Sequence, residues 1–336
     1  MNTILSNFSL KDYNTFNLDV KSDKFISIIS EDQLIDFLSQ HKGEENIFFL
    51  GGGSNVLFSR DYKGTIAHIS IKGKKIIEEL DDNIIIEVSS GENWHEFVMW
   101  SIDNNYGGVE NLSLIPGNVG AAPIQNIGAY GVELKDVFDS CRVLSIETNE
   151  IKHFNKEECE FDYRSSVFKS KEKNKYVILS IRLKLTKDSH SYNLSYDSLK
   201  ERFNDKEINL SNISDEIIKI RESKLPDPKK IGNCGSFFKN PLIELKDLEK
   251  ILEKYPKLPH HKIQNGLYKI PAAWLIEKMG FKEKNLGDAG VYNNQPLVVV
   301  NNGNASGSDI LNFTNSIKKS VQEEFNIDLE EEVNII

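Results

Sequence analysis

The sequence predicts an α+β protein of three units. Short strands and amphipathic helices alternate in the first part of the chain, and the middle part is richer in strands. The 336 residues exceed the roughly 250–300 residues at which a single hydrophobic core stops growing. Leu225-Pro226-Asp227-Pro228 follows a predicted helix and marks a domain boundary, because two prolines interrupt the period of a helix and of a strand.

Helices and strands alternate in the first 104 residues. Ser30-Glu31-Asp32-Gln33 resembles a capping box, and apolar residues follow it at helical spacing. The apolar run Ile47-Phe48-Phe49-Leu50 predicts a short buried strand, residues 83–88 a second strand, and residues 92–104 a helix. From Tyr106 to Glu133 the chain is rich in Gly, Pro and Asn without a clean period, and such long stretches tend to be functional.

The middle of the chain predicts antiparallel strands. Residues 142–146 and 151–154 flank a short polar segment and predict a hairpin. Residues 176–185 alternate, so that one face carries only apolar side chains, namely Val177, Leu179, Ile181, Leu183 and Leu185. A helix from about Ser214 to Lys224 then leads to the proline-rich boundary.

Beyond that boundary the sequence predicts helices over residues 244–255 and 271–279 and a strand over residues 297–300. Ser308 is the expected N-cap of a last long helix, whose apolar stripe comprises Ile310, Phe313, Ile317, Val321 and Phe325. Residues 328–336 are strand-like. Their period of two places Leu329, Val333 and Ile335 on one face and directs Glu332 to the other.

The charge composition excludes some classes of function. Lys and Arg number 41 against 51 Asp and Glu, so the net charge is −10, which argues against broad nucleic-acid binding because that needs a basic surface. An anionic small substrate is still possible, since a local cluster of Arg and Lys can bind one in an acidic protein. No apolar run approaches the roughly 20 residues of a membrane-spanning helix, and the N-terminus does not resemble a signal peptide.

Cysteine and histidine patterns predict neither disulfides nor a metal site. Cys141, Cys159 and Cys234 are widely spaced and follow no C-x-x-C pattern, so we expect unpaired thiols in a reducing compartment. His95-Glu96-Phe97-Val98-Met99 begins like the zinc-binding H-E-x-x-H motif, but Met99 replaces the second histidine. The seven histidines show no metal-ligand spacing.

Two glycine-rich segments are candidate ligand sites. The first, Gly51-Gly52-Gly53-Ser54-Asn55, follows a strand and is suited either to exposing backbone N–H groups to a phosphate or to forming a plain turn. It lacks the third glycine of a Rossmann fingerprint and the lysine of a P-loop. The second, residues 115–131, has small residues where a planar ligand would lie against backbone, and Gln125, Asn126 and Tyr130 as polar groups. An Ω-like surface loop is the alternative.

Together these segments resemble a known family. Residues 50–57 and 115–131 are similar to the FAD-binding domain of the UDP-N-acetylenolpyruvoylglucosamine reductases. The resemblance continues in the family's order over nearly the whole chain, at residues 161–169, 224–228, 232–241 and 329–333.

The resemblance implies a fold of three parts. Residues 1–72 and 73–222 would form a two-part FAD-binding domain of the vanillyl-alcohol-oxidase/PCMH type. An α+β substrate-binding domain would cover residues 225–328, and the C-terminal strand, residues 329–336, would return to the core carrying Glu332.

The resemblance also implies a reaction in cytoplasmic peptidoglycan precursor synthesis. NADPH would reduce non-covalently bound FAD, and the flavin would reduce UDP-N-acetylglucosamine enolpyruvate to UDP-N-acetylmuramate. Hydride from flavin N5 would reach the vinyl carbon and a proton the adjacent carbon. Such a site needs a cation for the developing charge and an acid at the carbon. We expect a monomer with no nucleic-acid or membrane partner.

Arg164, Ser236 and Glu332 match the family's catalytic residues. By resemblance, Arg164 and Glu332 engage and polarise the substrate carboxylate, and Ser236 donates the proton. A planar guanidinium suits a carboxylate better than an ammonium group does. Without the resemblance, the three would be interpreted as a surface arginine, a turn serine and part of a solvated acidic run.

Other positions match the family's binding residues. Tyr196 corresponds to the tyrosine of a mobile loop that closes over the nucleotide diphosphate, which indicates the long form of the family. The remaining implied substrate contacts are Tyr130, Lys224, Asn240 and Gln295. The implied FAD contacts are Gly51, Gly52, Gly53, Ser54, Asn55, Ile115, Pro116, Gly117, Gly120, Ala121, Ile124, Gln125, Gly128, Gly131 and Arg221.

Two features depart from some relatives. Ala121-Ala122 replaces paired serines, so hydroxyl contacts to FAD are lost there, and Cys234 stands where alanine is common. Two alternative functions stay open. An alcohol oxidase with the same FAD domain would often tether FAD through a His or Cys, and neither glycine segment contains one. A non-catalytic nucleotide-binding module would be unaffected by Ser236→Ala.

Overall fold

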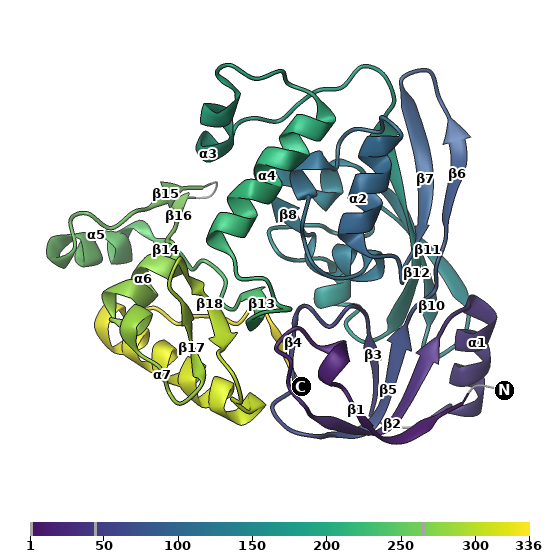
Figure 1. Ribbon diagram of the computed structural model, residues 1–336, viewed down its shortest axis with the longest axis horizontal. Coiled ribbons are helices and arrows are strands. Elements are labelled where there is room, and N and C mark those ends of the chain that lie inside the picture. Colours follow the sequence, from purple (N-terminus) through teal and green to yellow (C-terminus); the bar gives the residue numbers. More distant parts are fainter. Residues whose placement is uncertain (1–2, 44–45, 264–265) are drawn as a thin grey trace. The chain divides into compact units, whose positions relative to one another are not determined.

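The computed structural model describes residues 3–43, 46–263 and 266–336 (Figure 1). The chain forms two compact units. The first consists of Met1–Phe8, Ser22–Gly52 and Lys63–Arg221, and the second of Ser9–Lys21, Gly53–Tyr62 and Glu222–Ile336. The second unit therefore includes two short segments from the N-terminal part of the chain. The division of residues 1–222 at residue 72 stays a prediction.

A four-stranded sheet begins the first unit, in the order β1 (Leu5–Ser9), β2 (Lys21–Ile28), β5 (Tyr62–Ile69) and β3 (Ile47–Leu50). β3 is the predicted strand and pairs parallel with β5, but only Leu50 is buried and the other three residues are half-buried. Helix α1 (Glu31–Gln40) starts at the predicted cap, where the Ser30 side chain accepts a hydrogen bond from the Gln33 N–H. The reciprocal bond of a capping box is displaced by one residue, since Gln33 Oε1 accepts from the Ile29 N–H at 2.6 Å.

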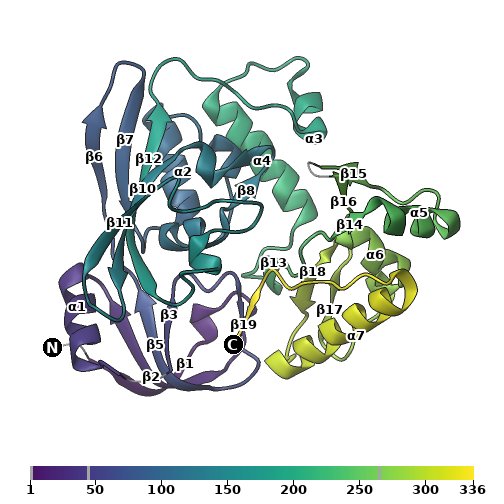
Figure 2. The ribbon, with the colours of Figure 1, turned by 180° about the vertical axis from the view of Figure 1, so that it is seen from behind.

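The second sheet of this unit is antiparallel and has five strands. Its order is β11 (Ile151–Asn155), β10 (Phe138–Ser145), β12 (Tyr176–Thr186), β7 (Asn83–Ser89) and β6 (Lys74–Glu79) (Figure 2). The β10–β11 hairpin confirms the prediction. All five apolar residues of the predicted face of β12 are buried, but so are Ile178 and Ser180, because both faces of this central strand are covered.

Strand β6 differs from its neighbours because all six of its residues are exposed. It forms one edge of the sheet, and its pairing with β7 shifts register between Ile76 and Glu78. A bulge thus interrupts an edge strand whose outer residues are the charged Lys74, Lys75, Glu78 and Glu79.

Helices and short elements complete the unit. Helix α2 (Trp94–Asp103) packs with the five-stranded sheet around the core residues Trp94, Phe97, Ile86 and Leu183. Helix α4 (Leu210–Lys224) begins four residues before the predicted start and packs with α3 (Asp197–Lys200) through Leu199 and Ile217. The hairpin β8 (Gly128–Ala129) and β9 (Val132–Glu133) lies in the long aperiodic stretch.

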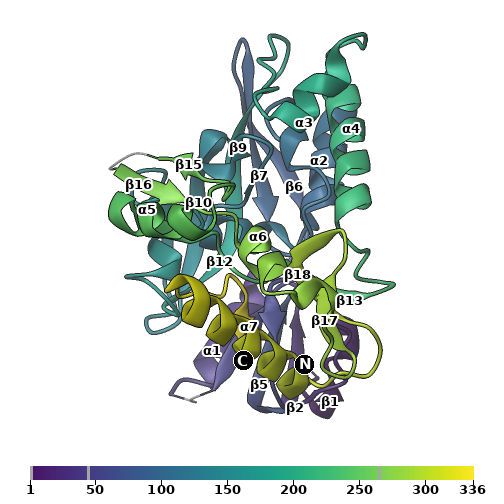
Figure 3. The same ribbon diagram turned by 90° about the vertical axis from the view of Figure 1, so that its left-hand side faces the viewer.

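The second unit contains two three-stranded sheets. One has the order β13 (Gly232–Ser236), β18 (Gln295–Asn301) and β17 (Ala289–Tyr292), and the other β14 (Leu242–Glu244), β16 (Leu267–Lys269) and β15 (His261–Lys262). Helix α5 (Leu245–Lys254) packs on β14 and β16, and α6 (Ala272–Lys278) and α7 (Gly307–Phe325) pack on the β17–β18 hairpin (Figure 3). Among the described residues the 3-10 helices are η1 (Lys11–Tyr13), η2 (Glu110–Leu112), η3 (Val119–Gln125), η4 (Leu134–Asp136), η5 (Val167–Lys169), η6 (Glu201–Phe203) and η8 (Phe281–Glu283).

The predicted apolar stripe of α7 is buried, but its predicted N-cap is wrong. Ser306, not Ser308, caps the helix, because its side chain accepts from the Asp309 N–H while Asp309 accepts from the Ser306 N–H. Ser308 lies inside the first turn. Ser306-Gly307-Ser308-Asp309 forms this reciprocal box with an aspartate at the third helical position.

The C-terminal segment is not one continuous strand. Residues 330–332 bond to Phe237 and Lys239 through the backbone, and residues 334–336 then bond to residues 55–59. Only β19 (Asn334–Ile335) qualifies as a strand, and it pairs parallel with β4 (Val56–Leu57) (Figure 1). Leu329 and Val333 are buried as predicted. Ile335, expected on the same face, is 39% exposed because the segment changes partners before it.

A search of the described helices finds none with the length and apolar character needed to cross a membrane. Within the same described residues, no group of three or more His, Cys, Asp or Glu side chains forms a metal site.

The carboxylate of Glu216 stabilises the end of the first unit. Its side chain is 3% exposed and lies 2.5 Å from Lys206 Nζ, 2.9 Å from Lys219 Nζ and 3.3 Å from Arg202 Nη1. Hydrogen bonds from Lys206 and Lys219 lower the pKa of this carboxyl from 4.5 to about 2. A lowered folded-state pKa contributes stability that is present above the unfolded pKa and is lost as the pH falls through the folded value.

We therefore expect Glu216→Gln to lower the free energy of unfolding at pH 7 by about 1.5–3 kcal/mol. The difference from the wild type should shrink between pH 4.5 and 2, where the wild-type carboxylate gains its proton. Urea unfolding at several pH values measures both effects. Glu160→Gln, at the exposed pair with Lys171, is the control and should change stability little. A loss at Glu216 that is independent of pH would contradict the electrostatic explanation.

Candidate active site

The two glycine segments approach each other closely at Gly52. A Cβ atom on Gly52 would lie 3.0 Å from Gly117 Cα and 2.9 Å from Asn118 Oδ1, so only glycine fits without a shift of the backbone. The Trp94 N–H at the start of α2 donates to Gly117 O at 3.0 Å and fixes the second segment. Gly52, Pro116 and Ala121 are exposed. The first unit therefore presents accessible backbone from both segments at one place.

The side chain of Asn126 hydrogen-bonds to three residues that follow it in the chain. It is fully buried and ends η3 in the left-handed conformation. Its Nδ2 donates to Glu133 Oε2 at 3.1 Å and to Asp162 O at 3.2 Å, and its Oδ1 accepts from the Lys135 N–H at 3.0 Å. Asn126 was interpreted as a polar group for a ligand. That interpretation is wrong, since its amide is occupied by protein partners.

Arg164 lies at the tip of a tight turn. Asp162 and Ser165 exchange both backbone hydrogen bonds at 3.1 Å, and Arg164 between them adopts a left-handed φ of 52°. Its Nη2 donates to Gly128 O at 2.9 Å, and its guanidinium lies 5.6 Å from the centre of the Tyr163 ring. The turn and these contacts orient a half-buried guanidinium.

Arg164 belongs to a cluster with Arg221, Tyr130 and His95. The pKa of Arg221 is lowered, mainly because the residue is buried. Tyr130 partly offsets this effect, and the positive charge of Arg164 adds to it. Burial and Arg221 lower the pKa of His95, whose Nδ1 accepts the Leu114 N–H at 3.0 Å. His95 is thus held neutral at pH 7. Arg221 Nε is buried and has no hydrogen-bond partner among the described residues, so this cationic cluster retains a free donor.

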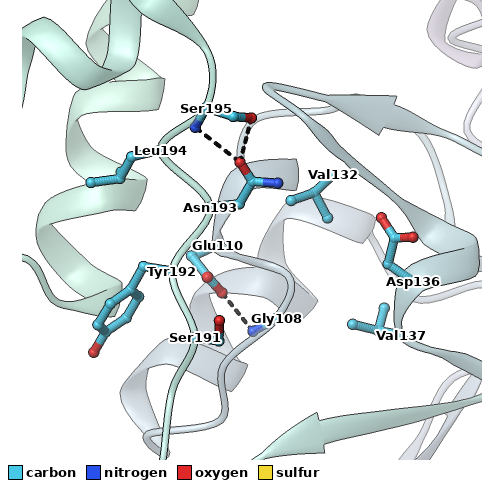
Figure 4. Close-up of a pocket in the computed structure, with 10 residues that line it drawn as sticks. All are labelled: Gly108, Glu110, Val132, Asp136, Val137, Ser191, Tyr192, Asn193, Leu194 and Ser195. Carbon is cyan, nitrogen blue, oxygen red and sulfur yellow. Dashed lines mark hydrogen bonds between the residues drawn. The ribbon is translucent and has the colours of Figure 1, made fainter.

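The segment before Tyr196 covers a cavity of about 540 Å³ in the first unit (Figure 4). Asn193 ties the segment to the β8–β9 turn, since its Nδ2 donates to Gly131 O at 2.9 Å, and its Oδ1 accepts from Ser195 Oγ at 2.6 Å. Glu110 lines the cavity, and burial raises the pKa of its carboxyl. Tyr196 itself is 49% exposed, and its ring meets Tyr130 edge-on at 5.3 Å.

In the second unit, Ser236 and Glu332 lie on neighbouring segments. Ser236 ends β13 opposite Val298, and the Glu332 N–H donates to the carbonyl of Phe237, the next residue, at 2.8 Å. Glu332 is half-buried and precedes the buried Val333. Burial, and to a lesser extent the Glu332 carboxylate, raises the pKa of Cys234. The Cys234 thiol is therefore an unreactive, protonated group at neutral pH.

The other predicted site residues divide between the units. Gly51, Ile115, Gly120, Ile124, Gln125, Gly128 and Gly131 belong to the first unit, and Gly53, Ser54, Asn55, Lys224, Asn240 and Gln295 to the second. Asn55 Nδ2 donates to the Glu332 carbonyl at 3.3 Å, and Asn240 Oδ1 accepts from the Ala272 N–H at the start of α6. Lys224 is exposed at the end of α4.

Three residues with site contacts were missed or misjudged from the sequence. His95 was considered only as a metal ligand, and Asn126 only as a ligand contact. Asn233, which accepts a hydrogen bond from Gly235 just before Ser236, lies within residues 232–241, but no role was predicted for it. For Asn126 and Asn233 the available signal was an asparagine within a glycine-containing motif, whereas His95 had no such signal.

Comparison with known families defines the class of the protein. The family model described as "FAD binding domain" matches residues 24–155. The two glycine segments lie close together at Gly52, and the buried Arg221 Nε has no hydrogen-bond partner among the described residues. Both observations fit an extended anionic cofactor of this kind. The chain is therefore an FAD-binding oxidoreductase of the α+β class, and the predicted fold of a PCMH-type FAD domain followed by an α+β C-terminal domain is confirmed.

The particular family follows from the full-length matches. The model described as "UDP-N-acetylenolpyruvoylglucosamine reductase, C-terminal domain" matches residues 227–336. The reductase of this name from Flavobacterium johnsoniae is 51% identical over 336 residues, covering 99% of both chains, and that from Amoebophilus asiaticus is 43% identical over 335 residues, covering 98% of both. The chain belongs to the UDP-N-acetylenolpyruvoylglucosamine reductase family.

A solved structure supports the fold over the same length. The crystal structure of UDP-N-acetylenolpyruvylglucosamine reductase from Thermus caldophilus aligns with a TM-score of 0.68 at 21% identity, covering 100% of this chain and 98% of that chain. The likeness therefore extends over both units.

The approach of the glycine segments gives a test of cofactor binding. We expect Gly52→Ala to purify with less than half of the wild-type FAD content, because the methyl group would separate residue 52 from Gly117. Flavin absorbance per protein measures the content. Gly287→Ala is the control, since a Cβ there would have no other atom within 4 Å and Gly287 is not one of the implied FAD contacts. Equal losses in both variants would mean that contact with Gly117 is not the cause.

Proposed function

We propose that this protein catalyses the NADPH-dependent reduction of UDP-N-acetylglucosamine enolpyruvate to UDP-N-acetylmuramate, with bound FAD, in cytoplasmic peptidoglycan precursor synthesis. The observation that carries the proposal is the 51% identity to the Flavobacterium johnsoniae reductase over 99% of both chains. The arginine cluster in the first unit and the paired Ser236 and Glu332 segments in the second supply side chains of the types that such a reaction needs.

Residues of both glycine segments would hold FAD. The exposed backbone at Gly52, Pro116 and Ala121 is suited to contact with the diphosphate, and Arg221 offers a donor to the flavin. When bound, FAD would supply hydride transfer between NADPH and the vinyl carbon of the substrate. Because neither glycine segment contains His or Cys, we infer that the cofactor is held non-covalently.

Arg164 would bind and polarise the substrate carboxylate. Hydride addition at the vinyl carbon leaves enolate-like negative charge on the carboxylate side, and a fixed guanidinium stabilises that charge. The hydrogen bond to Gly128 O and the left-handed turn orient Arg164 in advance, so little reorganisation accompanies the reaction. We assign to Glu332 the role of engaging and polarising the substrate carboxylate together with Arg164.

Ser236 would donate the proton that completes the reduction. The hydride and this proton together add two hydrogens across the double bond, and solvent replaces the proton that the hydroxyl loses. Tyr130, Tyr196, Lys224, Asn240 and Gln295 would bind the nucleotide and sugar. Lys224 offers a mobile point charge for phosphate, and Tyr196 lies in an exposed segment suited to covering the substrate.

The decisive experiment separates the two half-reactions. Without oxygen, NADPH should bleach the flavin absorbance, and UDP-N-acetylglucosamine enolpyruvate should restore it. We expect Ser236→Ala to keep the bleaching rate within a factor of about two and to slow the restoration by roughly 10²–10⁴-fold, the usual contribution of a general acid. Wild-type flavin that stays bleached would overturn the proposed substrate and favour an oxidase or another reductase.

The planar fork of Arg164 can be tested with its charge preserved. We expect Arg164→Lys to slow flavin restoration by roughly 10–100-fold, since a hydrogen bond to a charged group contributes about 1.5–3 kcal/mol. FAD content should not change. Arg182→Lys, at the Glu87 ion pair of the same unit, is the control and should leave both half-reactions as in the wild type. An equal rate in Arg164→Lys would exclude a specific carboxylate contact.

A further inference from the structure

The strand that carries Ser236 contains a bulge immediately before it. Asn233 pairs with Val300 and Ser236 with Val298, so three steps along β13 match two steps along β18. Residues three apart on a regular strand face opposite sides of a sheet, whereas residues opposite Val300 and Val298 face the same side. The inserted residue therefore decides to which side of the sheet the Ser236 hydroxyl is directed.

Gly235 provides the backbone conformation of the bulge. Its φ is +75°, in the left-handed region, where an L side chain costs roughly 1–2 kcal/mol. A Cβ atom added to Gly235 would have no other atom within 4 Å. The requirement for glycine is thus conformational and not a matter of space.

The side chain of Asn233 holds the bulge. Its Oδ1 accepts from the Gly235 N–H at 3.0 Å, and its Nδ2 donates to Ile231 O at 2.9 Å and to Pro226 O at 3.1 Å. Asn233 is 5% exposed, and its own N–H donates to Thr15 O at 2.8 Å. Both amide hydrogens and one lone pair are used. An aspartate would direct a charged oxygen at two carbonyl oxygens, so the arrangement requires an amide.

The same frame extends to Glu332. The residue after Ser236, Phe237, donates its N–H to Leu297 O at 2.9 Å and accepts the Glu332 N–H at 2.8 Å. A change in the bulge would therefore shift Ser236 and the backbone that fixes Glu332 together.

We infer that Asn233 is a positioning residue, which holds Gly235 in its left-handed conformation and thereby directs the Ser236 hydroxyl at the reacting carbon. This inference rests on the proposed function. Asn233 does not itself donate the proton. Its contribution is to restrict the serine to one orientation, and a displacement of about 1 Å in such a group can cost roughly 100-fold in rate.

The test compares Asn233→Ala with Asn301→Ala. Asn301 is a matched control because it is also 5% exposed, lies in the same sheet opposite Gly232 and hydrogen-bonds to four backbone groups, at Phe16, Gly303 and Ala305. None of these four bonds involves the bulge. We expect Asn233→Ala to slow flavin restoration by substrate roughly 10–100-fold while bleaching by NADPH stays within a factor of about two. Asn301→Ala should leave the ratio of the two rates unchanged.

A readout independent of activity accompanies the kinetics. In Asn233→Ala the amide hydrogen of Gly235 should exchange with solvent faster than in the wild type and in Asn301→Ala, because its acceptor has been removed. Equal exchange and an unchanged rate ratio would overturn the inference. If the wild-type flavin is not restored by the substrate, the proposed function fails first, which distinguishes the two failures.

A pair of glycine variants tests the same inference if Asn233→Ala does not fold. Gly235→Ala should reproduce the selective slowing of restoration, since it strains the bulge without a steric clash. Gly287→Ala is its control, because Gly287 also has a left-handed φ, +59°, with no atom within 4 Å of a Cβ, and lies in the same unit away from Ser236. Equal rate ratios in the two glycine variants would contradict the role of the bulge.

Discussion

Buried backbone groups outside helices and strands need hydrogen-bond partners, and in this protein asparagine side chains supply many of them. Asn14, Asn126, Asn233 and Asn301 are each at most 5% exposed and each join at least two separate backbone positions. An amide combines an acceptor with two donors, so one side chain satisfies a carbonyl and an N–H at the same time. These buried amides therefore stabilise the irregular segments that they join.

Periodicity predicted the regular elements well. The hairpin β10–β11, the strand β3 and the apolar stripe of α7 depend on local patterns of apolar residues, and the structure has them where they were expected. The prediction was wrong where a segment depends on partners distant in sequence. Residues 334–336 leave Phe237 and Lys239 and pair beside residues 55–59, a change of partner that no pattern within residues 328–336 encodes.

The candidate site came from resemblance to a family and not from periodicity. Motif order identified Arg164, Ser236 and Glu332, whereas on their own they have the appearance of ordinary surface residues. The sequence did not predict the left-handed backbone of Arg164 or the cluster that it forms with Arg221 and His95, because these residues come from segments far apart in the chain. It also treated Asn126 as a ligand contact, since the burial of an amide depends on tertiary packing that a motif does not reveal.

The edge strand β6 bears on how the protein behaves at high concentration. Open sheet edges are templates for aggregation, because their free N–H and C=O groups pair readily with another chain. On β6, Lys74 and Lys75 at one end, Glu78 and Glu79 at the other and a bulge between Ile76 and Glu78 oppose such pairing, since a strand docking there must match charges and bend around the bulge. The largest sheet of the molecule can therefore end in water without recruiting a neighbour, and Ile76 and Ile77 are exposed at little risk of nucleating fibres.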